Sequence, residues 1–244
     1  MTRALQWEGL LNVRDLGGIP TEDGGETRFG VIVRSDNVRR LRDLSTLEHH
    51  GISRVVDLRF DEEVAYDAHR ELPVEVVHVA LMHFDPAFRA DLEDRALELG
   101  PVAYLEWSYL HFLEEFRDNF GRAVRAIAQA RGPVCVHCMG GRDRTGLVTA
   151  LVLRMAGVSV DDVAGDYWLS EEALREDHER WVAEAPDERQ AQLRAIFLVA
   201  PREAMAGVLT ELERRYGSVR SYLRAAGVPD DELDALSARL RGDE

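Results

Sequence analysis

The most informative stretch of this sequence runs from Val134 to Gly146 and reads VCVHCMGGRDRTG. Its first four residues are mostly apolar and β-branched, which is typical of a strand covered on both faces. From Thr145 to Ala156 the chain is apolar nearly all round, which predicts a buried helix. The stretch therefore predicts a strand, a tight loop and a helix in succession, a unit typical of α/β proteins.

The loop between this strand and this helix has the features of an anion-binding site. N–H groups at the start of a helix lack partners within the helix, and the helix dipole favours negative charge there. Glycines let a backbone turn its amides inward and approach a phosphate closely. We therefore expect a phosphoryl group to be held by Met139, Gly140, Gly141, Arg142 and Thr145.

Cys138 opens the loop, and we predict that it acts as a nucleophilic thiolate. A helix N-terminus and nearby cations bring a thiol pKa from about 8.5 to about 3.5–7.5. Six residues later, Arg144 has a planar guanidinium that can bind two phosphoryl oxygens and hold the charge of the transition state. Thr145 is expected to donate its hydroxyl to the thiolate, and His137 to orient the loop. These residues predict a hydrolase of phosphate monoesters that works through a phosphocysteine intermediate.

The leaving oxygen also needs a proton, a contribution commonly worth about 10²–10⁴-fold. Asp143 is our first choice as general acid, and then as base for the water of the second step. A thiolate and a bound dianion would raise its pKa, whereas Arg142 and Arg144 would lower it. Asp57, at the end of a predicted strand, is the alternative acid or an orienting partner. Three further acids lie upstream in no recognisable loop motif: Asp85, Asp91 and Asp94.

Residues 137–146 resemble the signature of the protein tyrosine phosphatase superfamily, His-Cys-x-x-Gly-x-x-Arg-Ser/Thr-Gly, with every defined position present. Near the N-terminus, residues 12–18 (NVRDLGG) resemble an element of one bacterial branch, the atypical tyrosine and lipid phosphatases. That branch also has Asp at the position of Asp143. The resemblance extends to residues 34–36, 56–59 and 216–224. It implies a four-stranded parallel sheet flanked by helices, no metal or other cofactor, and activity on phosphotyrosine, with phosphoserine, phosphothreonine and phosphoinositides as further substrates.

One position of the loop departs from this branch, which usually has Lys where this chain has Arg142. The chain has 30 cationic residues, and all of them are arginine. A general preference for arginine over lysine in this chain is therefore the simplest explanation for Arg142 at the lysine position. A guanidinium is bulkier than an ammonium and forks where the ammonium is a point donor, so the change bears most on phosphoinositide activity.

The rest of the chain gives the predicted architecture. Short apolar runs at 31–33, 54–58, 74–79 and 134–137 predict a small, mostly parallel four-stranded sheet. Helical patterns occupy 45–51, 102–116, 119–130 and most of the chain after 145, with segments at 170–185, 186–199, 201–216 and 229–241. We expect an α/β fold in one phosphatase domain, 1–244. Eleven acids between Ser159 and Gln190 favour a solvated face, whereas the resemblance implies that residues 170–199 form a lid.

The composition of the chain limits the kinds of molecule that it is expected to bind. A net charge of −15 argues against nucleic acid and against electrostatic attachment to anionic lipid. The first residues, MTRALQWEGLLNV, lack the basic and apolar regions of a signal peptide. The most apolar stretch, 146–158, is too short to insert stably in a membrane. We expect a cytoplasmic protein, with export by an unusual route still open, and a phosphorylated protein or a phosphoinositide as substrate. The oligomeric state is not predicted.

Several alternatives stay open at this point. A phosphate-binding pseudoenzyme would keep the fold, but it would need neither a thiolate nor an acid. A rhodanese-type sulfurtransferase also uses a Cys loop, without the Arg-Thr-Gly continuation. Cys135 starts out facing away from Cys138 in a strand, so it is expected to be a core residue. Residues 12–18 could be only a turn, and Arg34 and Arg59 could bind ligand or pair with carboxylates.

Overall fold

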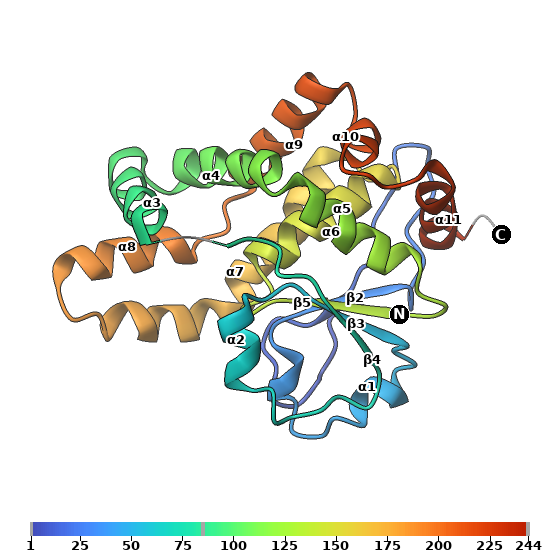
Figure 1. The fold of residues 1–244 in the computed structure, drawn as a ribbon, viewed down its shortest axis with the longest axis horizontal. Coiled ribbons are helices and arrows are strands. Elements are labelled where there is room, and N and C mark those ends of the chain that lie inside the picture. The colour runs from blue at the N-terminus through green and yellow to red at the C-terminus, as the bar shows by residue number, and fades with distance from the viewer. Residues whose placement is uncertain (1, 84–85, 243–244) are drawn as a thin grey trace.

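The computed structural model describes residues 2–83 and 86–242, and it shows a sheet with helices on both faces (Figure 1). Five strands of the described chain follow the order β1-β2-β5-β3-β4. The four strands β2, β5, β3 and β4 are parallel to their neighbours, and β1 pairs with β2 in the antiparallel direction. The predicted α/β class is confirmed.

The helices and strands have the following bounds: β1 Arg14–Asp15, β2 Ile32–Ser35, the 3-10 helix η1 Val38–Arg40, α1 Thr46–His49, β3 Arg54–Asp57, α2 Asp61–Tyr66, β4 Glu75–His78, α3 Pro86–Leu99, α4 Pro101–Glu115, α5 Arg117–Ala128, β5 Val134–His137, α6 Asp143–Met155, α7 Val160–Ala183, α8 Glu188–Leu198, α9 Arg202–Tyr216, α10 Val219–Ala225 and α11 Asp230–Arg241.

Alternation along the strands divides the core between the two faces of the sheet. In β5, Val134 and Val136 join the larger cluster, which is built mainly with α4, α5, α6 and α9. Cys135 joins the smaller cluster on the other face, with Trp7 and Leu47 among its members. Cys135 is wholly buried and unoxidised, and its place in the core confirms the sequence prediction. Burial raises the pKa of its thiol far above the ordinary value, as is typical of a structural cysteine.

The four parallel strands end at one edge of the sheet. His137, the last residue of β5, is in register with Ser35 of β2 and Asp57 of β3. The loop of residues 138–142, which we name the signature loop, therefore leaves the sheet between the ends of β2 and β3. In open α/β sheets this carboxyl edge is where ligands bind.

The structure corrects several details of the sequence prediction. The sheet has a fifth strand, because residues 14 and 15 pair with β2 instead of forming only a turn. The long helix α7 begins at Val160, ten residues before the expected start, since Ser159 caps it through its hydroxyl. Ser45 precedes α1, but its hydroxyl bonds Asp43 and does not cap the helix. Helices α2 and α3 were not predicted.

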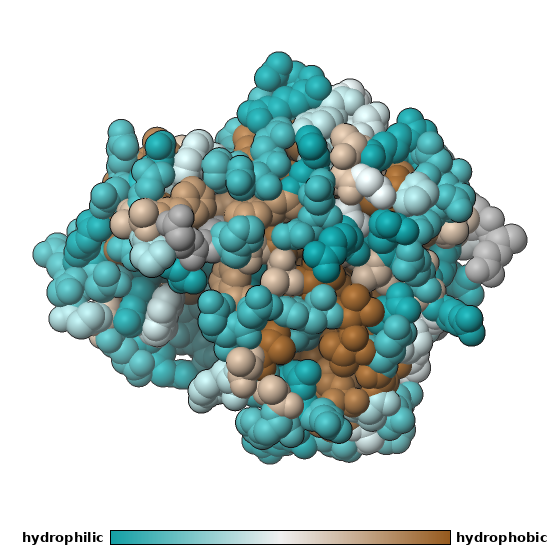
Figure 2. All heavy atoms as spheres, in the orientation of Figure 1, coloured by the Kyte–Doolittle hydropathy of each residue, from teal (hydrophilic) through white to brown (hydrophobic). Residues whose placement is uncertain are grey.

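The second half of α7 and α8 run antiparallel and form a hairpin that projects beside α3 (Figure 1). On the face shown in Figure 2, this hairpin is covered mostly by hydrophilic residues, whereas apolar residues gather over the sheet. Within the described residues, no helix is both long and apolar enough to cross a membrane.

Candidate active site

One backbone N–H group and two side chains donate hydrogen bonds to the backbone carbonyls of the signature loop. The carbonyl of Met139 accepts from the N–H of Asn37 at 3.1 Å. The carbonyl of Gly140 accepts from Asn12 Nδ2 at 2.9 Å, and that of Gly141 accepts from Arg34 Nη2 at 2.8 Å. The N–H groups on the opposite side of these peptides make no hydrogen bond within residues 2–83 and 86–242. The loop therefore has three backbone amides without a partner among the described residues, and such amides are suited to binding an anion.

Gly141 is required at the tightest point of this loop. Its φ is +67°, a conformation that side chains rarely adopt. A Cβ added at this position would lie 2.4 Å from the carbonyl oxygen of Ser35. Only glycine lets the loop pass so close to the end of β2.

Cys138 lies at the base of the loop, and its residue is only 2% exposed. Arg144, in the first turn of α6, is held by Glu63 of α2 through two contacts, Nη1 to Oε2 at 2.5 Å and Nη2 to Oε1 at 3.1 Å. Its guanidinium also lies over the ring of Phe60, 4.3 Å from the centroid. Burial lowers the pKa of Arg144, but interactions with Cys138, Glu63 and Asp143 more than reverse this, and its pKa rises. Arg144 therefore remains a fixed cation beside the sulfur.

Asp143 is the first residue of α6, and its side chain is 37% exposed. Arg142 donates to it twice, from Nε to Oδ1 at 3.1 Å and from Nη2 to Oδ2 at 2.9 Å. The hydroxyl of Tyr109 also donates to Oδ1. Partial burial raises the pKa of the Asp143 carboxyl, but Arg142, Tyr109 and Arg144 outweigh it and bring the pKa below its ordinary value. The sequence left open whether the pKa of Asp143 is raised or lowered. In the protein without bound phosphate it is lowered, mainly by the arginines.

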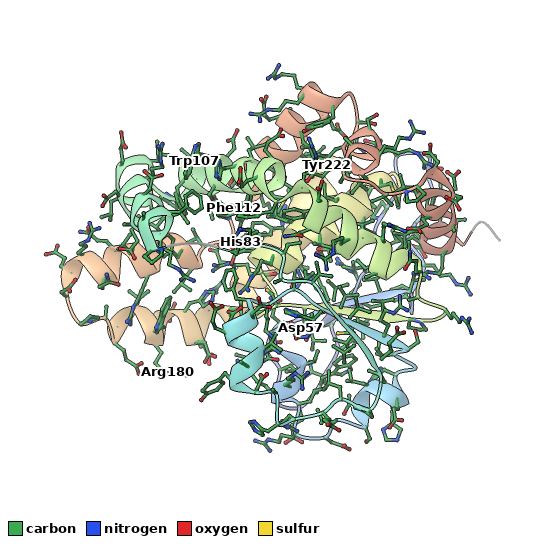
Figure 3. The ribbon with its side chains drawn as sticks, viewed as in Figure 1. Asp57, His83, Trp107, Phe112, Arg180 and Tyr222 are labelled. Atoms are coloured by element: carbon green, nitrogen blue, oxygen red, sulfur yellow. The ribbon has the colours of Figure 1, made fainter. Side chains whose placement is uncertain are left out.

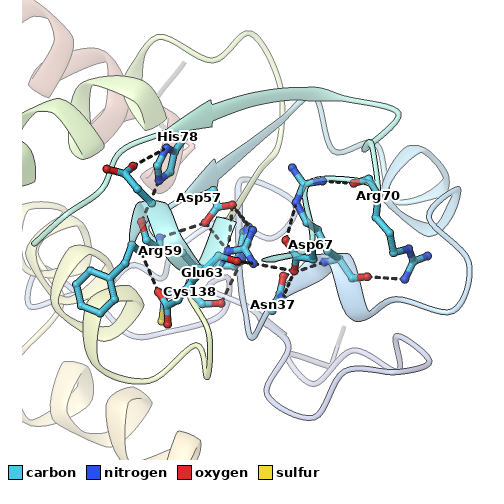
Figure 4. Close-up of polar contacts among 12 residues, drawn as sticks. Asn37, Asp57, Arg59, Glu63, Asp67, Arg70, His78 and Cys138 are labelled. Atoms are coloured by element: carbon cyan, nitrogen blue, oxygen red, sulfur yellow. Dashed lines mark hydrogen bonds and ion pairs between the residues drawn. The ribbon is translucent and has the colours of Figure 1, made fainter. Parts of the chain in front are cut away.

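Asp57 ends β3 beneath the loop, with its residue 1% exposed (Figure 4). Arg59 grips its carboxylate through Nε at 2.9 Å and Nη2 at 2.8 Å, and His137 Nε2 lies 3.5 Å away. Burial raises the pKa of Asp57, but His137 and Arg59 overcome this and bring the pKa to about 2. A carboxyl so firmly ionised is suited to orienting its neighbours and not to donating a proton.

His137 contacts the loop directly. Its Nδ1 lies 3.1 Å from the carbonyl oxygen of Cys138. Burial lowers the pKa of His137 below its ordinary value, although the negative charge of Asp57 opposes this. This contact fits the expectation that His137 orients the loop.

Behind the loop lies a buried group of charged and polar residues, which we name the floor network: Asn12, Arg14, Arg34, Asp166 and Ser170. Asp166 of α7 accepts from Arg34 Nη1 at 2.6 Å and from Arg14 Nε at 3.0 Å. Arg3 adds a third guanidinium to the same carboxylate. Burial and the charge of Arg34 lower the pKa of Arg14 to about 10. Behind the loop, the three guanidinium groups of Arg3, Arg14 and Arg34 therefore surround one carboxylate, and this excess of positive charge suits a loop that binds an anion.

The floor network settles two alternatives that the sequence left open. Residues 12–18 are more than a turn, since Asn12 bonds the loop and Arg14 pairs with Asp166. Arg34 pairs with Asp166, and Arg59 pairs with Asp57 and Asp67. Both arginines thus support the site by pairing with carboxylates.

Thr145 departs from its predicted contact. Its hydroxyl is buried and has no hydrogen-bond partner among the described residues, so the expected bond to Cys138 is not formed. The side chain of Arg142 is only 9% exposed. Its Nη2 also donates to the carbonyl of Phe197 at the end of α8, while Nη1 has no partner among the described residues.

A cavity of about 300 Å³ opens beside Asp143 and Arg144. Most of its wall is apolar or aromatic, and it includes Phe60, Met82, Tyr104, Leu105, Phe112 and Phe197. Phe197 brings the end of the α7–α8 hairpin to this wall. The cavity has the size and lining of a site for an aromatic group.

The three upstream acids are not near this chemistry as far as the structure describes them. Asp91 pairs with Arg95 at 2.8 Å, and Asp94 pairs with Arg189 at 3.0 Å, both on the exposed surface of α3. Asp85 lies outside the described residues. Of the sequence candidates, Asp143 is the acid that the fold places between the loop and the cavity.

Comparison with known proteins decides the family. A family model described as "Tyrosine phosphatase family" matches residues 5–242. The chain belongs to the tyrosine phosphatase family. It is similar to the triple specificity protein phosphatase PtpB of Mycobacterium tuberculosis, with 27% identity over 96% of this chain and 98% of the relative. It is also similar to a tyrosine-protein phosphatase of Nostoc commune, with 29% identity over 85% of this chain and 73% of the relative. This phosphatase is thus a phosphoric monoester hydrolase.

Sequence reasoning missed several residues of the phosphatase site. Glu63 follows β3 within an acidic run, and the run alone does not show that one of its carboxylates reaches Arg144. Tyr109 and Asp166 lie in helices far along the chain, and they meet the loop only through packing. The one available signal was the apolar spacing of residues 102–116, which places Tyr109 on the buried face of α4.

Proposed function

We propose that this phosphatase hydrolyses phosphotyrosine through a phosphocysteine intermediate on Cys138. The observation that supports this most directly is the position of Cys138 at the start of a loop whose carbonyls accept hydrogen bonds from Asn12, Arg34 and Asn37, while its amides have no partner among the described residues. In the first step, the thiolate attacks phosphorus while the loop amides and Arg144 bind the phosphoryl oxygens. The P–O bond breaks, and the leaving oxygen takes a proton.

Asp143 supplies this proton in the proposed mechanism. It is exposed to the cavity where an aromatic leaving group fits, whereas Asp57 is enclosed by Arg59 and His137. A bound phosphate dianion adds negative charge beside Asp143 and favours its protonated form. After the transfer, the ionised carboxylate accepts a proton from the water that cleaves the thiophosphate. Asp57 acts as an orienting partner.

The cavity supports phosphotyrosine as the preferred substrate, because its aromatic wall matches a phenyl ring. The relative named as a triple specificity phosphatase leads us to propose phosphoserine and phosphothreonine as slower substrates. Phosphoinositide turnover is proposed to be weaker still. Arg142, at the position of the branch's lysine, is occupied by Asp143 and Phe197.

The α7–α8 hairpin is proposed to act as a lid over the site. Three contacts support this role. Leu174 of α7 would lie 3.8 Å from a Cβ at Gly140, Phe197 lines the cavity, and Arg142 bonds the Phe197 carbonyl. Closure would restrict entry and shield Cys138 from oxidants.

Exchange of the nucleophile tests the intermediate. Cys138→Ser should abolish turnover of a phosphotyrosine peptide, a phosphoserine peptide and a phosphoinositide, yet still bind vanadate, because the loop amides and Arg144 remain. Rapid quenching of the wild-type enzyme with ³²P-labelled substrate should trap labelled protein that Cys138→Ser does not form. Turnover by the Cys138→Ser variant would remove Cys138 from the mechanism.

Substrates with graded leaving groups test the acid. Asp143→Asn should slow phenyl phosphate by about 10²–10³-fold and nitrophenyl phosphate far less, because nitrophenolate leaves without a proton. The measurement is the slope of log kcat against leaving-group pKa. A steep slope in Asp57→Asn, with a small uniform loss in Asp143→Asn, would transfer the role to Asp57.

A further inference from the structure

Three helices meet at the carboxyl group of Asp143. Tyr109 of α4 donates its hydroxyl to Oδ1, and the hydroxyl oxygen of Tyr167 of α7 lies 2.8 Å from that of Tyr109. The two tyrosine residues are only 2% and 1% exposed. The ring of Tyr167 also packs on α6, where a Cβ at Gly146 would lie 2.9 Å from Cδ2. Packing thus fixes both hydroxyls relative to the carboxylate.

The direction of these hydrogen bonds follows from the protonation states. Burial, with the charge of Asp143, raises the pKa of Tyr109 and of Tyr167 far above the ordinary value, so both keep their protons. An ionised carboxylate only accepts hydrogen bonds. Tyr109 therefore donates to Asp143, and Tyr167 in turn donates to Tyr109.

The two oxygens of Asp143 differ in how many donors they face. Oδ1 accepts from both Tyr109 and Arg142 Nε. Oδ2 accepts only from Arg142 Nη2 among the described residues. Since each carboxylate oxygen offers about two lone-pair positions, Oδ1 is saturated and Oδ2 keeps one position open.

We propose that Tyr109 is a positioning residue that, together with Arg142, saturates Oδ1 of Asp143 and reserves Oδ2 for the transferred proton. In the first step, the S–P bond forms, the P–O bond breaks, and the proton on Oδ2 passes to the leaving oxygen. In the second step, water gives a proton to Oδ2 as its oxygen bonds phosphorus and the thiolate leaves. This inference rests on the proposed role of Asp143 as acid and base.

The titratable and charged groups that act on Asp143 come from three elements. Its own segment contributes Arg142 and Arg144, α4 contributes Tyr104 and Tyr109, and α7 contributes Tyr167 and His178. The hydrogen bond from Tyr109 lowers the pKa of Asp143. Loss of that bond alone raises the pKa, so the pH at which the acid loses its proton moves upward.

Tyr109→Phe tests the proposal with two readouts. The turnover number for phenyl phosphate should fall about tenfold, because a proton can now settle on Oδ1, and that for nitrophenyl phosphate should fall less than about twofold. The alkaline limb of the pH–kcat profile should move to higher pH. If a folded Tyr109→Phe variant keeps both the wild-type slope of log kcat against leaving-group pKa and the wild-type alkaline limb, the proposal is overturned.

Tyr222→Phe is the matched control. Tyr222 of α10 is wholly buried, and its hydroxyl donates to the carbonyl of Leu113, also in α4, at 2.7 Å. It lies in the upper helical layer, away from Asp57 and the sheet (Figure 3). This variant loses a buried hydroxyl that bonds the same helix, α4, so it should lose stability while both readouts stay as in the wild type. A changed slope in Tyr222→Phe would show that loosening α4 suffices, and would overturn the specific role of Tyr109.

The Asp143→Asn background separates this inference from the proposed function. There, Tyr109→Phe should add no further change in slope, because the proton donor is already gone. If Asp143→Asn itself shows no dependence on the leaving group, the acid assignment fails and the inference fails with it. If Asp143→Asn shows the dependence and Tyr109→Phe does not, only the role of Tyr109 is wrong.

Discussion

Behind the signature loop, Asp166 is bonded by Arg14 and Arg34, and each of these residues is at most 5% exposed. In front of the loop, the Asp143 side chain is 37% exposed and borders a cavity. The floor network contains two buried ion pairs, Arg14 with Asp166 and Arg34 with Asp166, and its residues come from three distant segments of the chain. On the cavity side, the carboxyl of Asp143 is partly exposed, and a hydrogen bond from Arg142 to the Phe197 carbonyl joins the loop to α8.

This difference shows how the phosphatase divides its tasks. Buried ion pairs have few alternative arrangements, since breaking one leaves an uncompensated charge. The floor therefore holds the loop in a shape that fits a phosphoryl group before substrate arrives. The cavity side keeps the freedom to admit a substrate and to exchange a proton with it. Changes behind the loop should accordingly cost both stability and rate, while changes in front should alter selectivity.

Among changes that test this division of tasks, Arg34→Met should have the largest effect, because it removes a buried counter-ion of Asp166 and the donor to Gly141. We expect the free energy of unfolding to fall by about 3–5 kcal/mol and kcat to fall by about 10²-fold. Denaturant unfolding and the kcat of the folded fraction measure the two losses.

Arg154→Met is the control for this prediction. Arg154 is in α6 and also pairs with carboxylates, but its partners are Glu213 and Glu22, away from the loop. The Arg154→Met variant should lose some stability and keep the kcat of the wild type. A normal kcat in folded Arg34→Met would show that the floor does not shape the loop.

Asp57→Asn should have an intermediate effect, since Asp57 supports the loop without donating a proton. Its pKa in the folded protein is lowered to about 2, so it stabilises the fold above its unfolded pKa of about 3.9. That contribution, about 2–3 kcal/mol, is lost as the pH falls from about 4 to about 2. The variant should lack this part of the acid unfolding curve and should slow all leaving groups equally. Identical acid unfolding in variant and wild type would contradict this account.

Arg142→Lys should have the smallest effect on turnover of nitrophenyl phosphate, whose leaving group needs no proton from Asp143. A lysine cannot span Asp143 and the Phe197 carbonyl at once, so the proposed lid opens more often. The ratio of kcat/KM for a phosphoprotein to that for nitrophenyl phosphate should rise a few-fold, and peroxide should inactivate Cys138 faster.

Arg194→Lys provides the matched control within the hairpin. Arg194 of α8 donates to the Trp181 carbonyl at 2.6 Å and lies over the Trp181 ring, so it joins α7 to α8 without reaching the loop. It should leave both the substrate ratio and the peroxide rate unchanged. If Arg142→Lys behaves in the same way, the contact with Phe197 does not hold a lid.

The sequence by itself determined the α/β class, the four parallel strands and the strand–loop–helix unit that carries Cys138 and Arg144. These features are local, because they depend on β-branched runs, on glycines at fixed offsets and on an apolar helix that begins directly after the loop. The position of Cys135 in the core also followed from the alternation of side chains along β5.

Tertiary structure alone decided which groups surround the loop. The carboxylate partner of Arg144 is 81 residues away, and that of Arg34 is 132 residues away. No spacing in the sequence marks Glu63 or Asp166 among 45 acidic residues. The pKa of Asp143 was undecided for the same reason, since it depends on Tyr109, which packing of α4 against α6 and α7 brings within hydrogen-bond distance. Electrostatic effects depend on distance in space and on burial, and neither can be read from positions along the chain.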